Sequence, residues 1–237
     1  MPTVRIGLLT LPLAGLLAIW ATVAASAFVD AGIEPLEAAS AYNATSYFLS
    51  QFVGHIIGLT LLTLGIFALT VYLSDIRGER WTLGAMVLSI LGIGLLLSVY
   101  GLRTYALPAL GGAYLSGQQN AIEMANVVFG YPLTLVFYVA FLLYSAGFIL
   151  FGFAIWGSGT LPEWAGVLLA IHAPLLSGPL PEAFAVLGAL LLLIGGGWIA
   201  FAVLRKSPAR VGDCVEAESK PRERTRARSR IRRTGAK

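Results

Sequence analysis

Two histidines are the residues of this sequence whose type and surroundings could support chemistry. His55 and His172 each lie in an apolar stretch without a charged side chain. An ionisable group inside a bilayer is costly, so each is a functional candidate. Two imidazoles at similar depth on facing helices could ligate the iron of a b-type haem from opposite sides. The sequence therefore offers His55 and His172 as haem ligands.

A second interpretation of the same residues is helix packing. Gly54 and Gly58 flank His55 at the spacing that allows two membrane helices to approach closely, and a histidine can form an interhelical hydrogen bond. A proton relay is a third alternative. Two histidines fall short of the three or four protein ligands that zinc requires, so no metal site is predicted.

A second candidate group contains Arg103, Glu123 and Asn126, near the ends of two apolar stretches. Together with Tyr100 and Tyr105 these residues could line a polar vestibule that is continuous with the histidines and admits a small polar or cationic solute. The alternative is that they simply reach water at helix ends. We treat Arg103, Glu123 and Asn126 as candidate ligand-binding residues.

Motifs of known catalytic chemistry are missing from the sequence. Cys214 is the only cysteine, which excludes an intrachain disulfide, and it has no neighbouring histidine. The sequence contains no Gly-x-Ser-x-Gly elbow and no phosphate-binding loop. We predict no catalytic residue, and an enzyme would need a site of another kind.

The composition places these residues in a membrane protein. Of 237 residues, 57% are hydrophobic and 12% charged, with a mean hydropathy of +0.81. A soluble domain carries about 25% charged residues, so a water-exposed globule is excluded. The apolar residues form blocks of the length that crosses about 30 Å of hydrocarbon, and they do not alternate as barrel strands do.

Six blocks predict an all-α, polytopic transmembrane helix bundle over residues 1–204. The fourth block is longer than a bilayer requires and contains Pro132, where a kink could absorb the excess. The fifth block is short and contains Pro174. The six blocks lie between Arg5 and Asp30, at about Phe52–Leu73, between Arg80 and Arg103, at Val127–Trp156, at Trp164–Leu176 and at Ala183–Leu204.

Residues 205–237 form a polybasic C-terminal tail. They hold 12 of the 16 basic groups and lack apolar periodicity, which predicts disorder. Beside a membrane such a run is attracted to anionic lipid headgroups, and no specific nucleic-acid partner is expected because that attraction carries no sequence specificity. The predicted lipid-contacting residues are Arg222, Arg224, Arg226, Arg228, Arg230, Arg232 and Arg233.

The distribution of basic residues predicts the orientation. With six spans, Arg5, Arg77, Arg80 and the tail fall on one side, and this side is cytoplasmic by the positive-inside rule. Both termini of a multi-pass plasma-membrane protein would then be cytoplasmic. The alternative is a cleaved signal peptide ending near Ala27, which would leave five spans, although the first apolar run exceeds the usual signal core of about 7–15 residues.

Residues 151–169 resemble a stretch shared by a family of uncharacterised six-helix bacterial membrane proteins. In that family an apolar helix ends in a Ser-Gly pair, here Ser158-Gly159, and Leu-Pro opens the next helix, here Leu161-Pro162. A Gly-Val-Leu-Leu run follows, here beginning at Gly166. The resemblance implies a six-helix fold in the bacterial plasma membrane, and it implies no activity.

Three function classes follow from these residues. The first is a non-enzymatic membrane component that binds a small molecule or a partner helix through its outer half. The second is a membrane redox protein that holds haem b between His55 and His172. The third is a small-solute transporter, for which glycines and prolines could break helices near the midplane. No oligomeric state is predicted.

Overall fold

The computed structural model describes residues 2–26, 42, 44–74, 79–118, 120–178 and 180–205. Nearly all of these residues are helical, and none of them is in a strand. The helices are α1 (Pro2–Leu8), α2 (Thr10–Ser26), α4 (Thr45–Leu49), the π-helix η1 (Ser50–Ile57), α5 (Gly58–Ser74), α6 (Glu79–Leu115), α7 (Ala121–Val128), α8 (Tyr131–Ser158), α9 (Glu163–Ser177) and α10 (Glu182–Arg205).

The predicted all-α transmembrane bundle is confirmed. Five helical rods are long and apolar enough to cross a membrane, and many large apolar side chains point outward, among them Leu142 at 63% exposure and Phe153 at 69%. Water would not tolerate so much exposed apolar surface, whereas lipid does. The five rods are Thr3–Ala24, Thr45–Ser74, Trp81–Leu115, Ala121–Ser158 and Glu182–Arg205.

The fifth predicted span is α9, whose 15 residues make it shorter than the other five rods. At 1.5 Å per residue it extends about 22 Å, less than the hydrocarbon thickness of about 30 Å. It is nevertheless central to the bundle, because Ala165, Leu169 and His172 are completely buried. The hairpin from α8 to α9 turns at Gly159, whose φ of 60° is a left-handed helix exit.

The fourth predicted span, Val127–Trp156, lies within the apolar segment Ala121–Ser158, and the kink predicted near Pro132 is present. The chain forms α7, breaks at Phe129 and Gly130, and begins α8 at Tyr131, with Pro132 in the first turn. Proline has no N–H for the carbonyl four residues earlier, so a helix restarts at this point more readily than it continues. The break absorbs the length that exceeded the bilayer.

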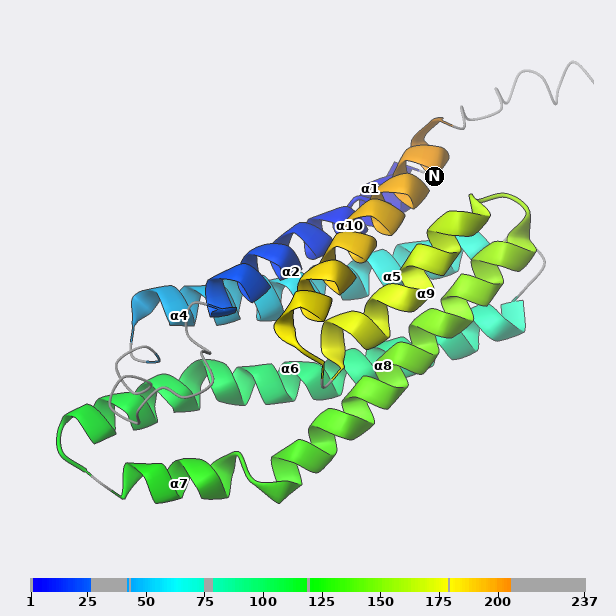
Figure 1. The fold of residues 1–237 in the computed structure, drawn as a ribbon. Coiled ribbons are helices and arrows are strands. Elements are labelled where there is room, and N and C mark those ends of the chain that lie inside the picture. Colours follow the sequence, from blue (N-terminus) through cyan, green and yellow to red (C-terminus); the bar gives the residue numbers. More distant parts are fainter. Residues whose placement is uncertain are drawn as a thin grey trace, which may run out of the picture. The chain divides into compact units, whose positions relative to one another are not determined.

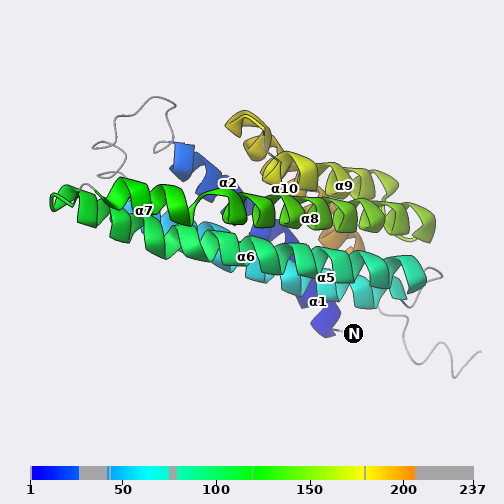
Figure 2. The ribbon, with the colours of Figure 1, turned by 90° about the horizontal axis from the view of Figure 1, so that it is seen from below.

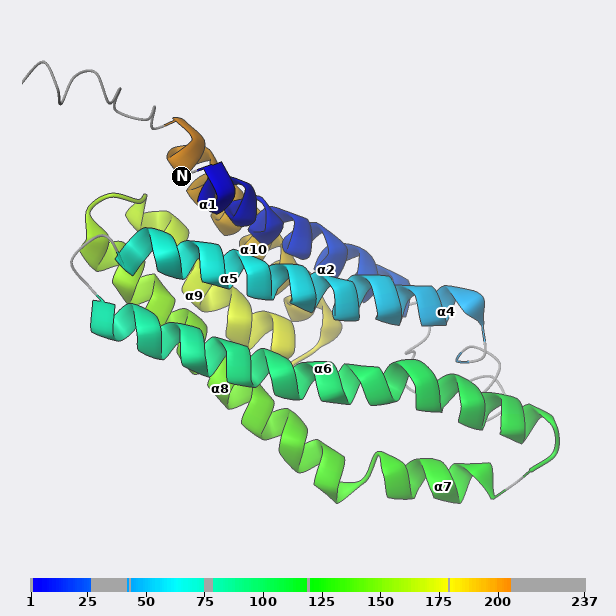
Figure 3. The same cartoon turned by 180° about the vertical axis from the view of Figure 1, so that it is seen from behind.

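The helices pack as antiparallel neighbours in a bundle with α6 between α5 and α8 (Figure 1; Figure 3, from behind). Seen from below, α8 lies between α6 and α9 (Figure 2). Glycines bring the backbones together: a Cβ at Gly92 of α6 would lie 2.4 Å from the Tyr144 nitrogen of α8. Gly188 of α10 approaches the backbone of Leu176 in α9 in the same way. Small residues at contacts are the usual basis of membrane-helix packing.

The predicted tail lies outside the described residues except for Arg205, which ends α10. This applies to its lipid-contacting arginines Arg222, Arg224, Arg226, Arg228, Arg230, Arg232 and Arg233, and also to Arg77 and to the predicted cleavage site at Ala27.

Candidate ligand-binding site

A cavity of about 620 Å³ lies within the bundle. Its walls come from every part of the bundle except α1, and most of the lining side chains are apolar. The lining residues are Ala14, Ala18, Thr22, Tyr42, Tyr47, Gln51, Gly54, His55, Gly58, Leu59, Leu62, Leu96, Tyr100, Arg103, Leu107, Ala125, Asn126, Phe129, Tyr144, Leu176, Ser177, Leu180, Glu182, Ala185 and Leu192.

The cavity changes from apolar to polar along its length. On α6 the lining residues run from Leu96 through Tyr100 and Arg103 to Leu107, and on the antiparallel α10 they run from Leu192 to Glu182. The leucines Leu62, Leu96 and Leu192 are 1–2% exposed and form an apolar floor. Because neighbouring helices run in opposite directions, their polar ends meet at the same end of the bundle. The cavity therefore has a polar mouth and an apolar floor.

The π-helix η1 presents two polar side chains to the cavity. Gly54 lies against Ala21 of α2, where an added Cβ would come within 2.2 Å of the Ala21 Cβ, and Gly58 would make an ordinary 3.5 Å contact with Leu17. These small residues hold the rod against α2, as the sequence spacing predicted. Gln51 and His55, which line the cavity together with these glycines, add polar side chains to its wall. Single π turns inside α-helices are frequent at functional sites.

Gln51 Oε1 and His55 Nδ1 are buried, and neither has a hydrogen-bond partner among the described residues. Gln51 is only 5% exposed, while the His55 ring stacks on Tyr100 with centroids 4.1 Å apart. A buried polar atom without a partner costs about 1–3 kcal/mol. A bound molecule or water in the cavity would supply the missing partners.

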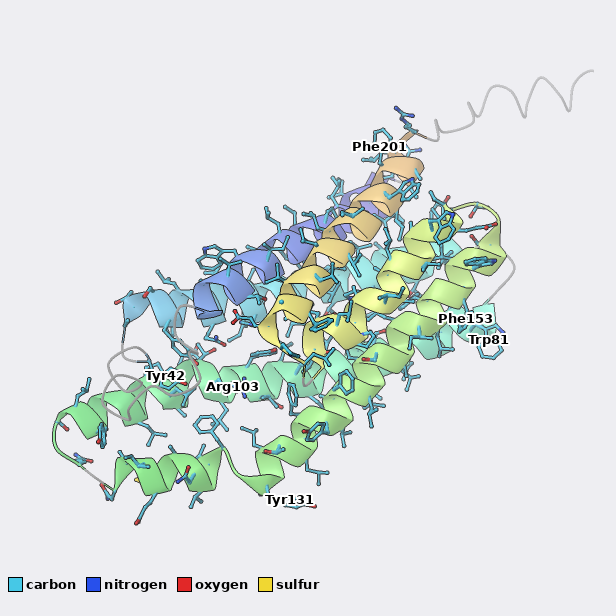
Figure 4. The ribbon with its side chains drawn as sticks, in the orientation of Figure 1. Tyr42, Trp81, Arg103, Tyr131, Phe153 and Phe201 are labelled. Atoms are coloured by element: carbon cyan, nitrogen blue, oxygen red, sulfur yellow. The ribbon has the colours of Figure 1, made fainter. Side chains whose placement is uncertain are left out.

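Among the described residues, one cation and one anion line the mouth. Arg103 on α6 and Glu182 on α10 both line the cavity with exposed side chains, and neither forms an ion pair within the described ranges. Tyr42 and Tyr47 stand beside them with their rings edge to face, 5.1 Å between centroids. Figure 4 shows Arg103 and Tyr42 far from Phe153 and Trp81, which mark the opposite end of the bundle.

Of the predicted vestibule, the structure brings Arg103, Asn126, Tyr100 and His55 into one cavity. Glu123 and Tyr105 do not line this cavity. Glu123 is exposed on α7 and does not line the cavity. Tyr105 is 59% exposed and packs its ring edge on Phe48 instead. The reason is helical geometry, because the α6 lining residues recur every three to four positions and Tyr105 falls off that face.

His172 does not share the cavity with His55. It is completely buried, its Nδ1 bonds the Leu169 carbonyl, and its Nε2 lies 2.9 Å from the Tyr144 hydroxyl. A carbonyl only accepts, so Nδ1 carries the hydrogen and Nε2 of the neutral ring accepts from Tyr144. The Nε2 lone pair is thereby engaged in an interhelical bond between α8 and α9, which is the packing alternative. As arranged here, His55 and His172 do not fit a bis-histidine haem.

A metal centre has no basis in the described ranges either. Within them, no group of three or more His, Cys, Asp or Glu side chains is placed to hold a metal ion.

The prediction missed several residues of the mouth. Tyr47, Gln51 and His55 recur at intervals of four, a polar stripe that the sequence displays. The stripe was overlooked, although His55 itself was predicted, because the second span was taken to begin at Phe52. The helical segment Thr45–Ser74 begins seven residues earlier. Glu182 was treated as a loop residue and is the first residue of α10.

Comparison with known proteins adds no relative. The chain matches no protein-family model, and no curated protein and no solved structure is significantly similar to it. The resemblance of residues 151–169 to a six-helix bacterial family stays a prediction.

Proposed function

We propose that this protein is a non-enzymatic, multi-pass membrane protein that binds a small molecule in the central cavity. The observation that carries the proposal is the graded lining, with three buried leucines at the floor and unpartnered Gln51 and His55 atoms above them. Small-molecule sites are commonly apolar cavities of about 300–1,000 Å³ with a few convergent polar groups. The volume of about 620 Å³ lies within this range.

The enclosure of the cavity favours a small molecule over a partner helix or a transported solute. An α-helix with its side chains is about 10–12 Å across, which is too wide for a cavity walled by helices of a single bundle. Transport requires a path to the other side, whereas Leu62, Leu96 and the fully buried Phe148 fill the bundle near the floor. Stable binding at one end agrees better with this packing.

We propose the orientation from the basic residues. Arg5 in α1 and Arg80 at the start of α6 lie at the ends of their helices remote from the cavity mouth. The positive-inside rule then gives cytoplasmic termini and a mouth on the outer side of a bacterial plasma membrane. The arginines of the tail would contact anionic lipid headgroups of the inner leaflet.

Saturable binding of an amphiphile tests the proposal. Radiolabelled 1-monolauroylglycerol is titrated into the purified full-length protein in a nanodisc. Ala185→Phe places a ring in the cavity, while Ala183→Phe makes the same change at an exposed position two residues earlier. We expect saturable binding by the wild type and by Ala183→Phe, and at least tenfold weaker binding by Ala185→Phe. Absence of saturable binding, or equal affinity of the two variants, would contradict the proposal.

A further inference from the structure

We infer that the ligand is a single-chain amphiphile whose headgroup carries both a phosphate and an ammonium group, with the chain on the apolar floor and the head at the mouth. This inference rests on the proposed function and specifies its ligand class. It is drawn from the charges, the aromatic rings and the unpartnered polar atoms of the cavity.

The charges at the mouth match a zwitterion. Arg103 on α6 and Glu182 on α10 line the same cavity. They form no ion pair with each other or with another described residue. A purely anionic head would satisfy Arg103 and meet repulsion from Glu182, and a purely cationic head would do the reverse. A phosphate recognised by the guanidinium, with an ammonium group near the carboxylate, satisfies both charges.

The aromatic side chains that line the cavity are a second feature that suits an ammonium group. Tyr42, Tyr47 and Phe129 line the cavity from three different segments, and the two tyrosine rings are in edge contact. Ring faces attract cations, and clusters of aromatic side chains are a known means of binding alkylated ammonium groups. An anionic ligand alone would make no use of these rings.

The buried polar atoms suit the linker between head and chain. Gln51 Oε1 and His55 Nδ1 lie in the wall below the charged mouth, on the same face of the rod. At this level a glycerol hydroxyl can donate a hydrogen bond to Gln51 Oε1, and an ester carbonyl can accept one from His55 Nδ1 when that nitrogen carries the hydrogen. They would give partners to two atoms that otherwise have none among the described residues.

The size of the cavity favours one acyl chain. A volume of about 620 Å³ lies in the usual range of small-molecule sites, about 300–1,000 Å³. A ligand with one acyl chain and a glycerol suits a site of this size, with the chain on the apolar floor and the head at the open mouth.

Competition binding tests the inference on the full-length protein in nanodiscs. The probe is radiolabelled lauroyl lysophosphatidylcholine. Its competitors are lauroyl lysophosphatidic acid, which lacks the ammonium, 1-monolauroylglycerol, which lacks both charges, and glycerophosphocholine, which lacks the chain. We expect the probe to bind at least tenfold more tightly than each competitor, because a hydrogen bond to a charged group contributes enough for a factor of about ten.

Two variants separate the roles of the charges. Arg103→Gln should weaken the probe and lysophosphatidic acid by about tenfold and leave monolauroylglycerol unchanged. Glu182→Gln should weaken the probe and leave lysophosphatidic acid unchanged or tighter. Glu123→Gln is the matched control, since this acid is exposed on α7 and does not line the cavity, and it should change nothing. Melting temperatures of the variants establish that each is folded.

The outcomes distinguish the inference from the proposed function. If monolauroylglycerol or lysophosphatidic acid binds as tightly as the probe, the zwitterion inference is overturned while cavity binding stands. The same holds if Glu182→Gln and Glu123→Gln behave alike. If no chain-bearing compound binds, both are overturned. Tight binding of glycerophosphocholine would show that the head alone is recognised, which would also overturn the inference.

Discussion

Replacement of Gly92 by alanine should destabilise the bundle, whereas the same replacement at Gly94 should not. The two glycines lie two residues apart on α6. A Cβ at Gly92 would lie 2.4 Å from the backbone nitrogen of Tyr144 and 2.7 Å from its Cα, but a Cβ at Gly94 would meet nothing within 4 Å. Carbon atoms pack best at about 3.5–4.0 Å, so α6 and α8 would have to separate by about 1 Å in Gly92→Ala.

The expected magnitude follows from two opposing terms. Alanine favours a helix over glycine by up to about 1 kcal/mol, and this gain is common to both variants. Overpacking of a close contact costs about 1–3 kcal/mol, and only Gly92→Ala pays it. The difference in unfolding free energy between the variants should therefore be about 1–3 kcal/mol. At about 2–4 °C per kcal/mol for a chain of this size, Gly92→Ala should melt several degrees below Gly94→Ala.

Intrinsic fluorescence provides the assay, because the chain contains five tryptophans. Both variants are purified in the same detergent at the same protein concentration and are heated together with the wild type. If Gly92→Ala melts at or above the temperature of Gly94→Ala, the close approach of α6 and α8 at Tyr144 is wrong, and so is the position of Tyr144 in the cavity wall.

Three further predictions follow from described contacts. Tyr144→Phe should lower the melting temperature, because it leaves the buried Nε2 of His172 without its hydrogen-bond partner at a cost of about 1–3 kcal/mol. Tyr138→Phe, at a position that is 44% exposed, should leave the melting temperature unchanged. Equal melting temperatures of the two variants would contradict the bond between Tyr144 and His172. Gly159→Ala should lower the free energy of unfolding by about 1–2 kcal/mol, because the backbone φ at this position is 60°. At Gly157 the φ is not positive and an added Cβ would meet nothing within 4 Å, so Gly157→Ala should be neutral or stabilising in the same assay. Titration with haem should give no Soret band of a bis-histidine complex, because Tyr144 and Leu169 form hydrogen bonds with both ring nitrogens of His172. A Soret band of this kind that is lost in His172→Ala would refute the hydrogen bonds assigned to His172.

Helix positions were largely predictable because they depend on apolarity and length. The sixth predicted span, Ala183–Leu204, differs by one residue at each end from α10. The short fifth predicted span, Trp164–Leu176, likewise differs by one residue at each end from α9. The kink of the fourth span near Pro132 was also predictable, because proline lacks the N–H that would continue the preceding helix.

The grouping of side chains around the cavity was less predictable. A helix that is apolar on every side has no preferred face in its sequence, so its rotation about its own axis is set by contacts with its neighbours. Gly54 against Ala21 and Gly92 against Tyr144 fix these rotations through backbone approach, which a single sequence does not reveal. This explains why the facing of the two histidines was left open, and why Glu182 was not grouped with Arg103.

Two buried serines allow a direct test of the cavity. Ser177 and Ser145 are 5% and 6% exposed, but Ser177 lines the cavity and Ser145 does not. Each is changed to cysteine after Cys214→Ser has removed the native thiol, and intact cells are treated with a membrane-impermeant methanethiosulfonate. The account predicts that Ser177→Cys reacts and that an excess of lauroyl lysophosphatidylcholine slows its reaction, while Ser145→Cys stays unmodified. Equal reactivity at the two positions, or no reaction at Ser177→Cys, would contradict a cavity that opens at the outer end of the bundle.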